Sequence, residues 1–210
     1  MTIEEYLERL LAGDADACVT EGRSRAVNLE GLEHLYLDLI EPSQYRVGEL
    51  WEAGRISVAR EHLATAINRY VMSACYAPLA RATTGGQRAV ITCTPGELHE
   101  LGARMLADLL ECDGWDVDFY GASMPAGDLA AAIRQSEPRF VGLSTALVMH
   151  LGFVKRSITT IRETLGPLTP PIVVGGHAYR EGADLWRQVG ADLYAADPAT
   201  AIPMLRRLKG

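Results

Sequence analysis

The sequence has 210 residues, of which 48% are apolar and 22% are charged, proportions that are typical of a soluble globular protein. Its formal net charge of −7, from 20 basic and 27 acidic residues, disfavours nonspecific binding to nucleic acid. The segment from Met1 to Leu11 is acidic and amphipathic rather than a signal sequence, and no apolar run approaches the length of a membrane span. The four cysteines are isolated, as in core residues of a reducing compartment, so we expect a cytoplasmic protein that does not bind membranes.

The N-terminal part of the chain shows helical patterns and no convincing strand. Thr2 followed by Glu5 predicts a capping box for a first helix. Asn28 and Ser57 are good N-caps for two later helices, and Pro42 is expected to kink the first of these two. Four helices with short connections predict a four-helix bundle.

A short polar segment at 82–87 predicts the boundary between a bundle at 1–83 and an α/β domain at 88–210. Beyond it, strand and helix patterns alternate, which predicts a parallel, doubly wound sheet of flavodoxin-like (Rossmann-like) type with strand order 2-1-3-4-5. The expected strands are 89–93, 116–120, 140–144, 171–174 and 192–194, and the expected helices are 98–112, 126–135, 150–165, 179–188 and 198–208.

The most unusual loop follows the first expected strand and runs from Gly96 to Gly102. It presents His99 two residues after Glu97, at the edge of the sheet where open α/β folds bind ligands. A carboxylate that fixes the tautomer of a histidine prepares it as a metal ligand. On these residues alone, an ordinary loop histidine near a helix start remains the alternative.

Two further loops follow neighbouring strands of the expected sheet. One carries Ser144, Thr145 and Leu147, with His150 just beyond, and the other runs from Gly175 through Gly176 to His177. Strands one, three and four are adjacent in the expected order, so all three loops line one side of a crevice. Singly, the glycine pair is also consistent with a plain turn, Ser144 with an ordinary strand end, and the two histidines with surface positions.

Together, the three loops resemble the cobalamin-binding signature Asp-x-His-x-x-Gly, Ser-x-Leu and Gly-Gly of methionine synthase, corrinoid carrier proteins and base-off mutases. Forty-one residues separate Gly102 from Ser144, and twenty-eight separate Ala146 from Gly175. The resemblance implies base-off/His-on cobalamin, with His99 as the lower axial cobalt ligand and Glu97 as its hydrogen-bonding partner. It implies cofactor contacts from Gly96, Glu97, Leu98, His99, Glu100, Leu101, Gly102, Ser144, Thr145, Leu147, Gly175, Gly176 and His177.

This sequence departs from that signature at two positions. Glu97 stands where aspartate is commonest, which adds one methylene to the side chain behind His99. Ala146 stands where leucine is commonest, with Leu147 beside it, and the smaller side chain is expected to widen the slot for the nucleotide tail.

The helical part carries a second pattern, in which Trp51 is followed after nine residues by Glu61 and His62. A core tryptophan and a solvated Glu-His pair are one interpretation. The pattern also resembles the bundle of CarH-type light-responsive regulators, which closes over the upper face of 5′-deoxyadenosylcobalamin. The resemblance implies that Trp51 packs on the adenosyl group, while Glu61 and His62 contact its polar edge.

The residue after Trp51 can be a cobalt-capturing histidine in CarH-type regulators, but here it is Glu52. Capture of cobalt after photolysis is therefore not available at that position, and His62 or His150 are the alternatives, or water. These regulators also carry a helix-turn-helix domain, and we expect none in this chain.

The favoured hypothesis is a stand-alone adenosylcobalamin light sensor, not an enzyme, that acts in signalling or transcription regulation. Photolysis of the cobalt–carbon bond would change the arrangement of bundle and sheet domain, and with it homo-oligomerisation or binding to a regulatory protein. The first alternative is a corrinoid methyl-carrier subunit of a methyltransferase system. The second is a flavodoxin-like domain that binds another nucleotide or nothing.

Overall fold

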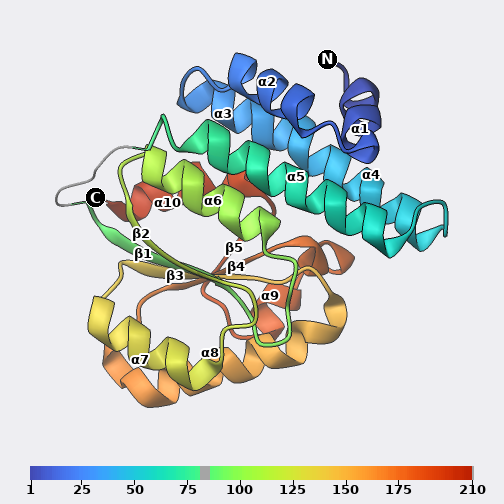
Figure 1. Cartoon of the computed structure of the whole chain (residues 1–210). Helices are drawn as coiled ribbons and strands as arrows, with labels where there is room; N and C mark the ends of the chain where they lie inside the picture. Colours follow the sequence, from blue (N-terminus) through green and yellow to red (C-terminus); the bar gives the residue numbers. More distant parts are fainter. Residues whose placement is uncertain (81–85, 210) are drawn as a thin grey trace. The chain divides into compact units, whose positions relative to one another are not determined.

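The computed structural model describes residues 1–80 and 86–209 (Figure 1). The chain divides into two compact units, of which the first is Met1–Ala80 and the second is the rest of the chain. The expected end of the bundle at residue 83, and most of the expected boundary segment 82–87, lie outside the described residues.

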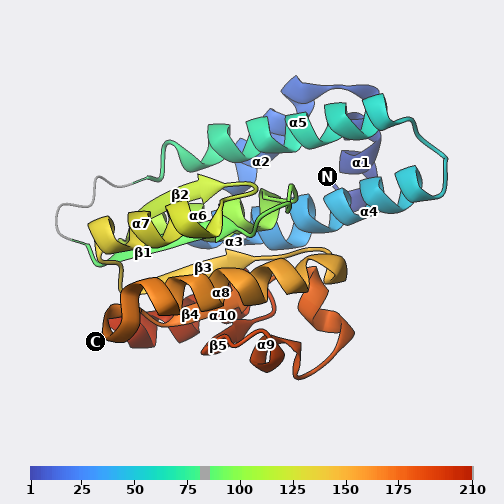
Figure 2. The same cartoon turned by 90° about the horizontal axis from the view of Figure 1, so that it is seen from below.

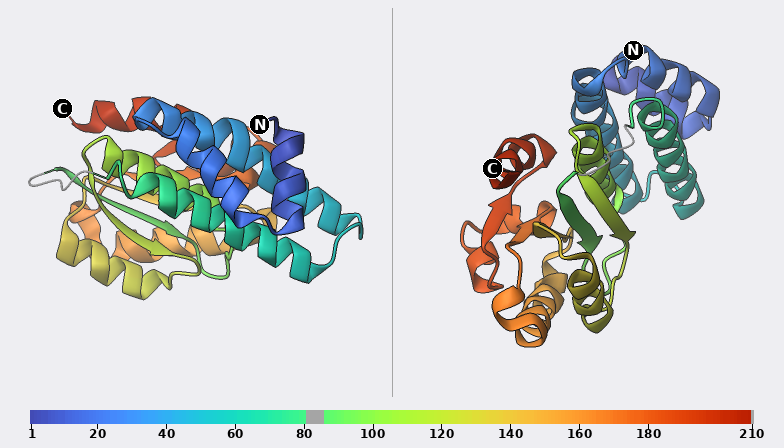
Figure 3. Two further views of the ribbon diagram at one scale, coloured as in Figure 1. Left: turned by 45° about the horizontal axis from the view of Figure 1, so that its top comes forward. Right: turned by 90° about the vertical axis from the view of Figure 1, so that its left-hand side faces the viewer.

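The first unit, called the helical unit below, is built from four helical rods, as predicted. The third rod is continuous from α3 through a π-helical turn into α4. Figure 3 shows these helices from two further sides. Their bounds are α1 Ile3–Ala12, α2 Ala15–Arg25, α3 Leu29–Leu35, the π-helical turn Tyr36–Ile40, α4 Glu41–Glu52 and α5 Val58–Tyr76.

The predicted helix starts are confirmed. The Thr2 hydroxyl accepts from the amide of Glu5 at 3.2 Å, and the Glu5 carboxylate accepts from the amide of Thr2 at 2.8 Å, which completes the capping box. Asn28 and Ser57 cap α3 and α5 by accepting from backbone amides three residues ahead. These polar side chains satisfy amides that have no partner within their own helix.

The irregularity expected at Pro42 takes the form of the π-helical turn that ends just before it. Proline has no amide proton, so the carbonyl of Asp38 cannot receive the usual helical hydrogen bond from position 42. A wider turn accommodates the missing bond without ending the helix. The hydroxyl of the buried Ser43 donates to the carbonyl of Ile40, the last residue of this turn, at 2.9 Å.

The second unit, called the sheet unit below, has five parallel strands in the order β2-β1-β3-β4-β5, which confirms the predicted topology (Figure 2). The elements are β1 Arg88–Cys93, α6 Leu101–Cys112, β2 Asp116–Gly121, α7 Ala126–Ser136, β3 Phe140–Ser144, α8 Leu151–Leu165, β4 Ile172–Gly175, α9 Leu185–Gln188, β5 Leu193–Ala195 and α10 Pro198–Arg206.

Two of the expected helices are corrected by the structure. The helix expected from 98 begins only at Leu101, because the chain first completes a turn and a short segment without regular secondary structure. The helix expected at 179–188 is divided into a 3₁₀ segment, His177–Glu181, and the short α9. Gly182 separates the two pieces with an extended backbone, which the apolar periodicity around it did not reveal.

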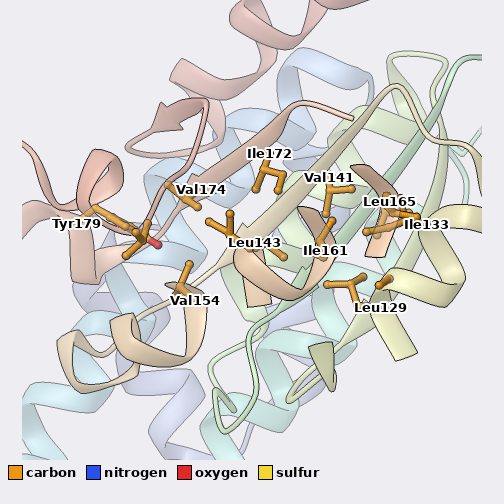
Figure 4. Packing of buried hydrophobic residues seen from close by; sticks show 14 residues of the cluster. Leu129, Ile133, Val141, Leu143, Val154, Ile161, Leu165, Ile172, Val174 and Tyr179 are labelled. Atoms are coloured by element: carbon orange, nitrogen blue, oxygen red, sulfur yellow. The ribbon is translucent and has the colours of Figure 1, made fainter. Parts of the chain in front are cut away.

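Helices cover both faces of the sheet, as Figure 1 shows for α7 and α8 on one face and α6 and α10 on the other. The first face buries branched aliphatic side chains (Figure 4), including Leu129, Ile133, Val141, Leu143, Val154, Ile161, Leu165, Ile172 and Val174. The opposite face buries smaller residues and Trp115, whose ring meets Phe140 edge-on at 5.2 Å between centroids. Within 1–80 and 86–209, no helix is long and apolar enough to cross a membrane.

Two helical glycines have different surroundings, so substitution by alanine should change the stability of the protein in opposite directions. A Cβ at Gly22 in α2 would lie 2.7 Å from Val71 Cγ1 and 2.9 Å from Cys75 Sγ, whereas a Cβ at Gly48 in α4 would meet nothing within 4 Å. We expect Gly22→Ala to lower the free energy of unfolding by about 1–3 kcal/mol through overpacking. Gly48→Ala should raise it by about 0.5–1 kcal/mol, because alanine restricts the unfolded chain and favours helix. Urea denaturation followed by circular dichroism measures both, and equal effects would contradict the close packing of α2 on α5.

Candidate functional site

The central loop of the candidate site begins with a tight turn directly after β1. The amide of Glu97 donates to the carbonyl of Thr94 at 3.0 Å, and Gly96 between them has φ +82°. Proline followed by glycine at the two central positions is typical of a type II turn, which requires positive φ at its third residue. The turn directs Glu97 inward and leaves His99 on the loop that leads to α6.

The Glu97 carboxylate is fully buried and accepts hydrogen bonds on both oxygens. Oε1 accepts from the amide of His99 at 3.0 Å and lies 2.6 Å from His99 Nδ1. Oε2 accepts from the amides of Ala146 at 2.9 Å and Leu147 at 3.2 Å, and it lies 3.0 Å from His150 Nδ1. One side chain from the β1 loop therefore holds the β3 loop in place.

The predicted pairing of Glu97 with His99 is present. An ionised carboxylate only accepts hydrogen bonds, so Nδ1 of His99 carries the proton and the ring lone pair lies on Nε2. The His99 side chain is 62% exposed although its carboxylate partner is buried. This arrangement is the one by which proteins fix the tautomer and raise the basicity of a metal-binding imidazole.

His150 is a second imidazole on the same carboxylate, a role that sequence reasoning missed. Of the two positions for which a surface location was an alternative, His177 is exposed and His150 is buried. The His150 ring lies edge-on to Phe153, with 6.0 Å between centroids. Nothing in its spacing from Glu97, fifty-three residues away, signals the contact, because the pairing of β1 with β3 creates it.

The hydrogen bonds at Glu97 determine its charge. Burial by itself raises the pKa of this carboxyl, but donation from His99, from His150 and from the amides of His99 and Ala146 outweighs burial, so the pKa lies far below its usual range. The pKa of the neighbouring Cys93 thiol is raised to about 12, mainly by burial and to a smaller extent by the negative charges of Glu97 and Glu100. Cys93 therefore stays a neutral core residue, as predicted for the cysteines.

The β4 loop is joined to the β3 loop through Thr145. Its amide donates to the carbonyl of Gly175 at 3.0 Å, and its carbonyl accepts from Ala178 at 3.3 Å. Gly176 has φ +104°, and a Cβ at this position would lie 2.4 Å from the Thr145 carbonyl oxygen. Glycine is thus required at position 176 by the close approach of its backbone to that of Thr145.

A fourth loop, after β2, also supports the site and was not expected. The Ser123 hydroxyl accepts from the amide of Gly96 at 3.0 Å, while the Ser123 amide donates to the Glu97 carbonyl at 3.0 Å. Ser123 has φ +53°, which is uncommon for a residue with a side chain. The turn that positions Glu97 is therefore held from β2 as well as from β3.

The surface around His99 is unusually apolar for a group of loops. Leu98 is 70% exposed and Met149 is 78% exposed, and Leu147 and Val148 are also exposed. A Cβ at Gly102 would meet nothing within 4 Å. Exposed apolar side chains that gather beside an accessible imidazole mark this surface as a candidate binding site for a ligand.

The other predicted residues of the sheet unit lie on the loops after β1, β3 and β4 or at their ends. Ser144 lies half-buried at the end of β3, beside the buried Thr145, and Glu100 and Leu101 are half-buried at the start of α6. His177 is exposed in the 3₁₀ segment after Gly176.

The three remaining predicted residues belong to the helical unit. Trp51 is 48% exposed near the end of α4, and Glu61 and His62 lie near the start of α5. α4 ends at Glu52 and α5 begins at Val58, so the short connection between them leaves all three residues near the same end of this hairpin.

The sheet unit is a doubly wound α/β domain that presents a carboxylate-backed histidine at the carboxyl edge of its sheet. Two family models, each described as a B12 binding domain, match this chain at residues 87–203 and 2–76. The chain belongs to the B12-binding domain family, and the exposed His99 and its apolar surroundings fit a corrin with its cobalt.

Relatives with known names fall into two groups. The transcriptional repressors CarH and CarA of Myxococcus xanthus are 37% identical over 145 residues and 36% identical over 128 residues. These matches cover 68% and 60% of this chain but only 47% and 43% of the repressors, so the chain spans about half their length. Dimethylamine corrinoid protein 1 of Methanosarcina acetivorans is 22% identical over 215 residues, with 99% of each chain covered.

Among solved structures, the monomethylamine corrinoid protein of Methanosarcina barkeri matches with a TM-score of 0.81 over 97% of this chain and 96% of its own. A cobalamin-binding protein of Desulfitobacterium hafniense matches with a TM-score of 0.56 over 99% and 98%. At 13% and 18% identity, these likenesses establish the fold.

The depressed pKa of Glu97 makes a prediction for acid stability. Its hydrogen bonds favour the ionised form, so they stabilise the cofactor-free fold fully above the unfolded pKa of about 4.3 and progressively less as the pH falls below it. We expect Glu97→Gln to lower the free energy of unfolding by about 1–3 kcal/mol at pH 7 and to flatten its decline between about pH 5 and pH 2. Urea denaturation at a series of pH values measures this, with the exposed Glu163→Gln as control. An unchanged slope would contradict the assignment.

The close approach at Gly176 makes a second prediction. Gly176→Ala should lower the free energy of unfolding by about 1–3 kcal/mol, because alanine is strained at φ +104° and its Cβ would clash with the Thr145 carbonyl. Gly102→Ala is the matched control in the same unit, since open space surrounds that position and stability should be preserved. Thermal unfolding of both variants compares them, and a fully stable Gly176→Ala protein would contradict the loop geometry.

Proposed function

We propose that this protein is an adenosylcobalamin-binding light sensor rather than an enzyme. Loss of the adenosyl group in light would change the arrangement of the helical and sheet units, and with it self-association or the binding of a regulatory partner. The observation that carries the cobalamin part is the exposed His99 backed by the buried Glu97, at 2.6 Å between Nδ1 and Oε1. The similarity to CarH and CarA supports a regulatory role over a catalytic one.

His99 is proposed to hold cobalt from below through Nε2, with Glu97 keeping Nδ1 protonated. Glu97 is held in turn by the amides of Ala146 and Leu147 and by His150, so its carboxylate does not rotate away when the imidazole binds metal. Ser144, Gly175 and Gly176 are proposed to line the slot for the nucleotide tail. The flanking residues Gly96, Leu98, Glu100, Leu101, Gly102, Thr145, Leu147 and His177 are proposed as further cofactor contacts.

On the upper side, Trp51, Glu61 and His62 are proposed to recognise the adenosyl group. A half-exposed indole at the end of α4 offers a face for stacking on adenine, and the Glu61 carboxylate accepts hydrogen bonds from ribose hydroxyls. When bound, the cofactor supplies a light-labile cobalt–carbon bond. The residue after Trp51 is Glu52, so this chain has no imidazole at that position to take the place of the lost group.

A corrinoid methyl carrier is the second candidate, because dimethylamine corrinoid protein 1 is covered over its whole length by this chain. A methyl group is small and has no hydrogen-bonding atoms. It therefore gives no reason for an exposed tryptophan and a Glu-His pair at one end of the α4–α5 hairpin. Cofactor preference distinguishes the two candidates.

The test is to load the cofactor-free protein with adenosylcobalamin in the dark and to record absorbance spectra before and after green light. We expect base-off/His-on binding in the dark and release of 5′-deoxyadenosine-derived product in light, with a stable new spectrum. His99→Ala should abolish the His-on spectrum, because the other imidazole on Glu97, that of His150, is buried. Trp51→Ala should bind corrin but discriminate less between adenosyl- and methylcobalamin.

Phenylalanine at position 51 is the matched control for this last variant, since it preserves an aromatic face. Tighter binding of methylcobalamin than adenosylcobalamin, together with no spectral response to light, would favour the methyl carrier. Wild-type behaviour of Trp51→Ala would remove the proposed contact with the adenosyl group.

A further inference from the structure

A continuous chain of polar side chains crosses the interior of the helical unit. It begins at Tyr6 in α1 and ends at the Glu61–His62 pair on α5. Its hydrogen bonds run from Tyr6 Oη to Asn68 Oδ1 at 2.9 Å, from Asn68 Nδ2 to Gln44 Oε1 at 3.0 Å, from Gln44 Nε2 to Thr65 Oγ1 at 2.7 Å and from Thr65 Oγ1 to Glu61 Oε1 at 2.8 Å.

In each of these four hydrogen bonds the donor is on the Tyr6 side and the acceptor is on the Glu61 side. Tyr6 and Asn68 are fully buried, and Gln44 and Thr65 are partly buried. The last acceptor is the carboxylate of Glu61, whose other oxygen lies 2.5 Å from Nδ1 of the exposed His62. Because hydrogen bonds in series polarise one another, the chain delivers an oriented donor to Glu61 from the core of the unit.

The polar side chains of this hydrogen-bonded series would destabilise the helical unit if they were buried without hydrogen-bond partners. A buried amide or hydroxyl that loses its partner destabilises a protein by about 1–3 kcal/mol, whereas an apolar side chain would fill the same space without that risk. Burial of Tyr6 strongly raises the pKa of its phenol, which therefore remains a neutral donor. A polar core that connects three helices and ends at one surface carboxylate fits a positioning role better than a stabilising one.

We propose that Tyr6, Asn68, Gln44 and Thr65 position the Glu61 carboxylate for ligand hydroxyl groups, so that residues in the core of the helical unit determine selectivity for the upper cobalamin ligand. This inference rests on the proposed function, in which Glu61 accepts from the ribose of the adenosyl group. Thr65 holds Oε1 and His62 holds Oε2, which fixes the plane of the carboxylate. Each oxygen retains capacity to accept a further hydrogen bond from a vicinal diol.

Thr65 offers a matched pair of variants. Thr65→Val keeps the shape of the side chain but removes its hydroxyl, whereas Thr65→Ser keeps the hydroxyl and removes a methyl group. We expect Thr65→Val to reduce the preference for adenosylcobalamin over methylcobalamin about fivefold to tenfold, which corresponds to the loss of one well-positioned hydrogen bond. Methylcobalamin affinity should be unchanged, and Thr65→Ser should retain the wild-type preference.

A background variant shows whether Thr65 acts through Glu61. In Glu61→Ala protein the preference is already reduced, and adding Thr65→Val should then reduce it no further. If Glu61→Ala lowers the preference but Thr65→Val does not, the inference is overturned while the proposed function stands. If Glu61→Ala also leaves the preference unchanged, the proposed contact with the adenosyl group fails and the inference fails with it.

A measurement on the cofactor-free protein tests the positioning step directly. The ¹⁵N chemical shifts of the His62 ring report the hydrogen bond from Nδ1 to Glu61. We expect Thr65→Val to shift them and Thr65→Ser to leave them in place, and identical shifts in all three proteins would overturn the proposal. Gln44→Met, at a half-buried position, provides a second way to interrupt the chain if Thr65→Val does not fold.

Discussion

The rest of the site depends on the hydrogen bonds that the ionised, buried carboxylate of Glu97 accepts. It accepts from the backbone and ring of His99, from two amides of the β3 loop and from His150 on the same β3 loop, so one charge joins the β1 loop to the β3 loop. A charge in the interior is stable only when it is this well solvated by donors, and the same donors keep its pKa low. The proton on His99 Nδ1, and with it the lone pair on Nε2, follow from that charge.

Glutamate at position 97 has one methylene more than aspartate, which gives its carboxylate a longer reach from the backbone. The Glu97 carboxylate contacts both His99 and the amides of Ala146 and Leu147, and the turn at Gly96 gives it the inward direction that these contacts need. His150 then completes the shell of donors. Two imidazoles on one carboxylate make this version of the motif different from a simple pair, because the charge that orients His99 is shared with a buried neighbour.

The helical unit also holds a carboxylate, that of Glu61, through hydrogen bonds, and here they form a longer series. Glu61 accepts from Thr65, Thr65 from Gln44, Gln44 from Asn68 and Asn68 from Tyr6, so a carboxylate at the surface is oriented from a buried tyrosine. In both units a carboxylate that accepts hydrogen bonds from buried or partly buried groups lies beside an exposed histidine. Membership of the B12-binding family, together with similarity to repressors and to corrinoid carriers, makes the upper-ligand preference the property that separates the candidate functions.

Local patterns were sufficient for a large part of this architecture. Capping residues such as Thr2 and Asn28 and apolar periodicities predicted the four rods and the five strands, because these elements depend on neighbours in the chain. The alternation of strand and helix predicted the strand order, because doubly wound sheets use few topologies. The pairing of Glu97 with His99 was also local. The roles of His150 and Ser123 were not, because they arise where β1 meets β3 and β2, and no spacing in one sequence encodes which loop residues then face each other. The late start of α6 and the chain from Tyr6 to Glu61 have the same origin, since each depends on contacts that exist only once distant segments have packed.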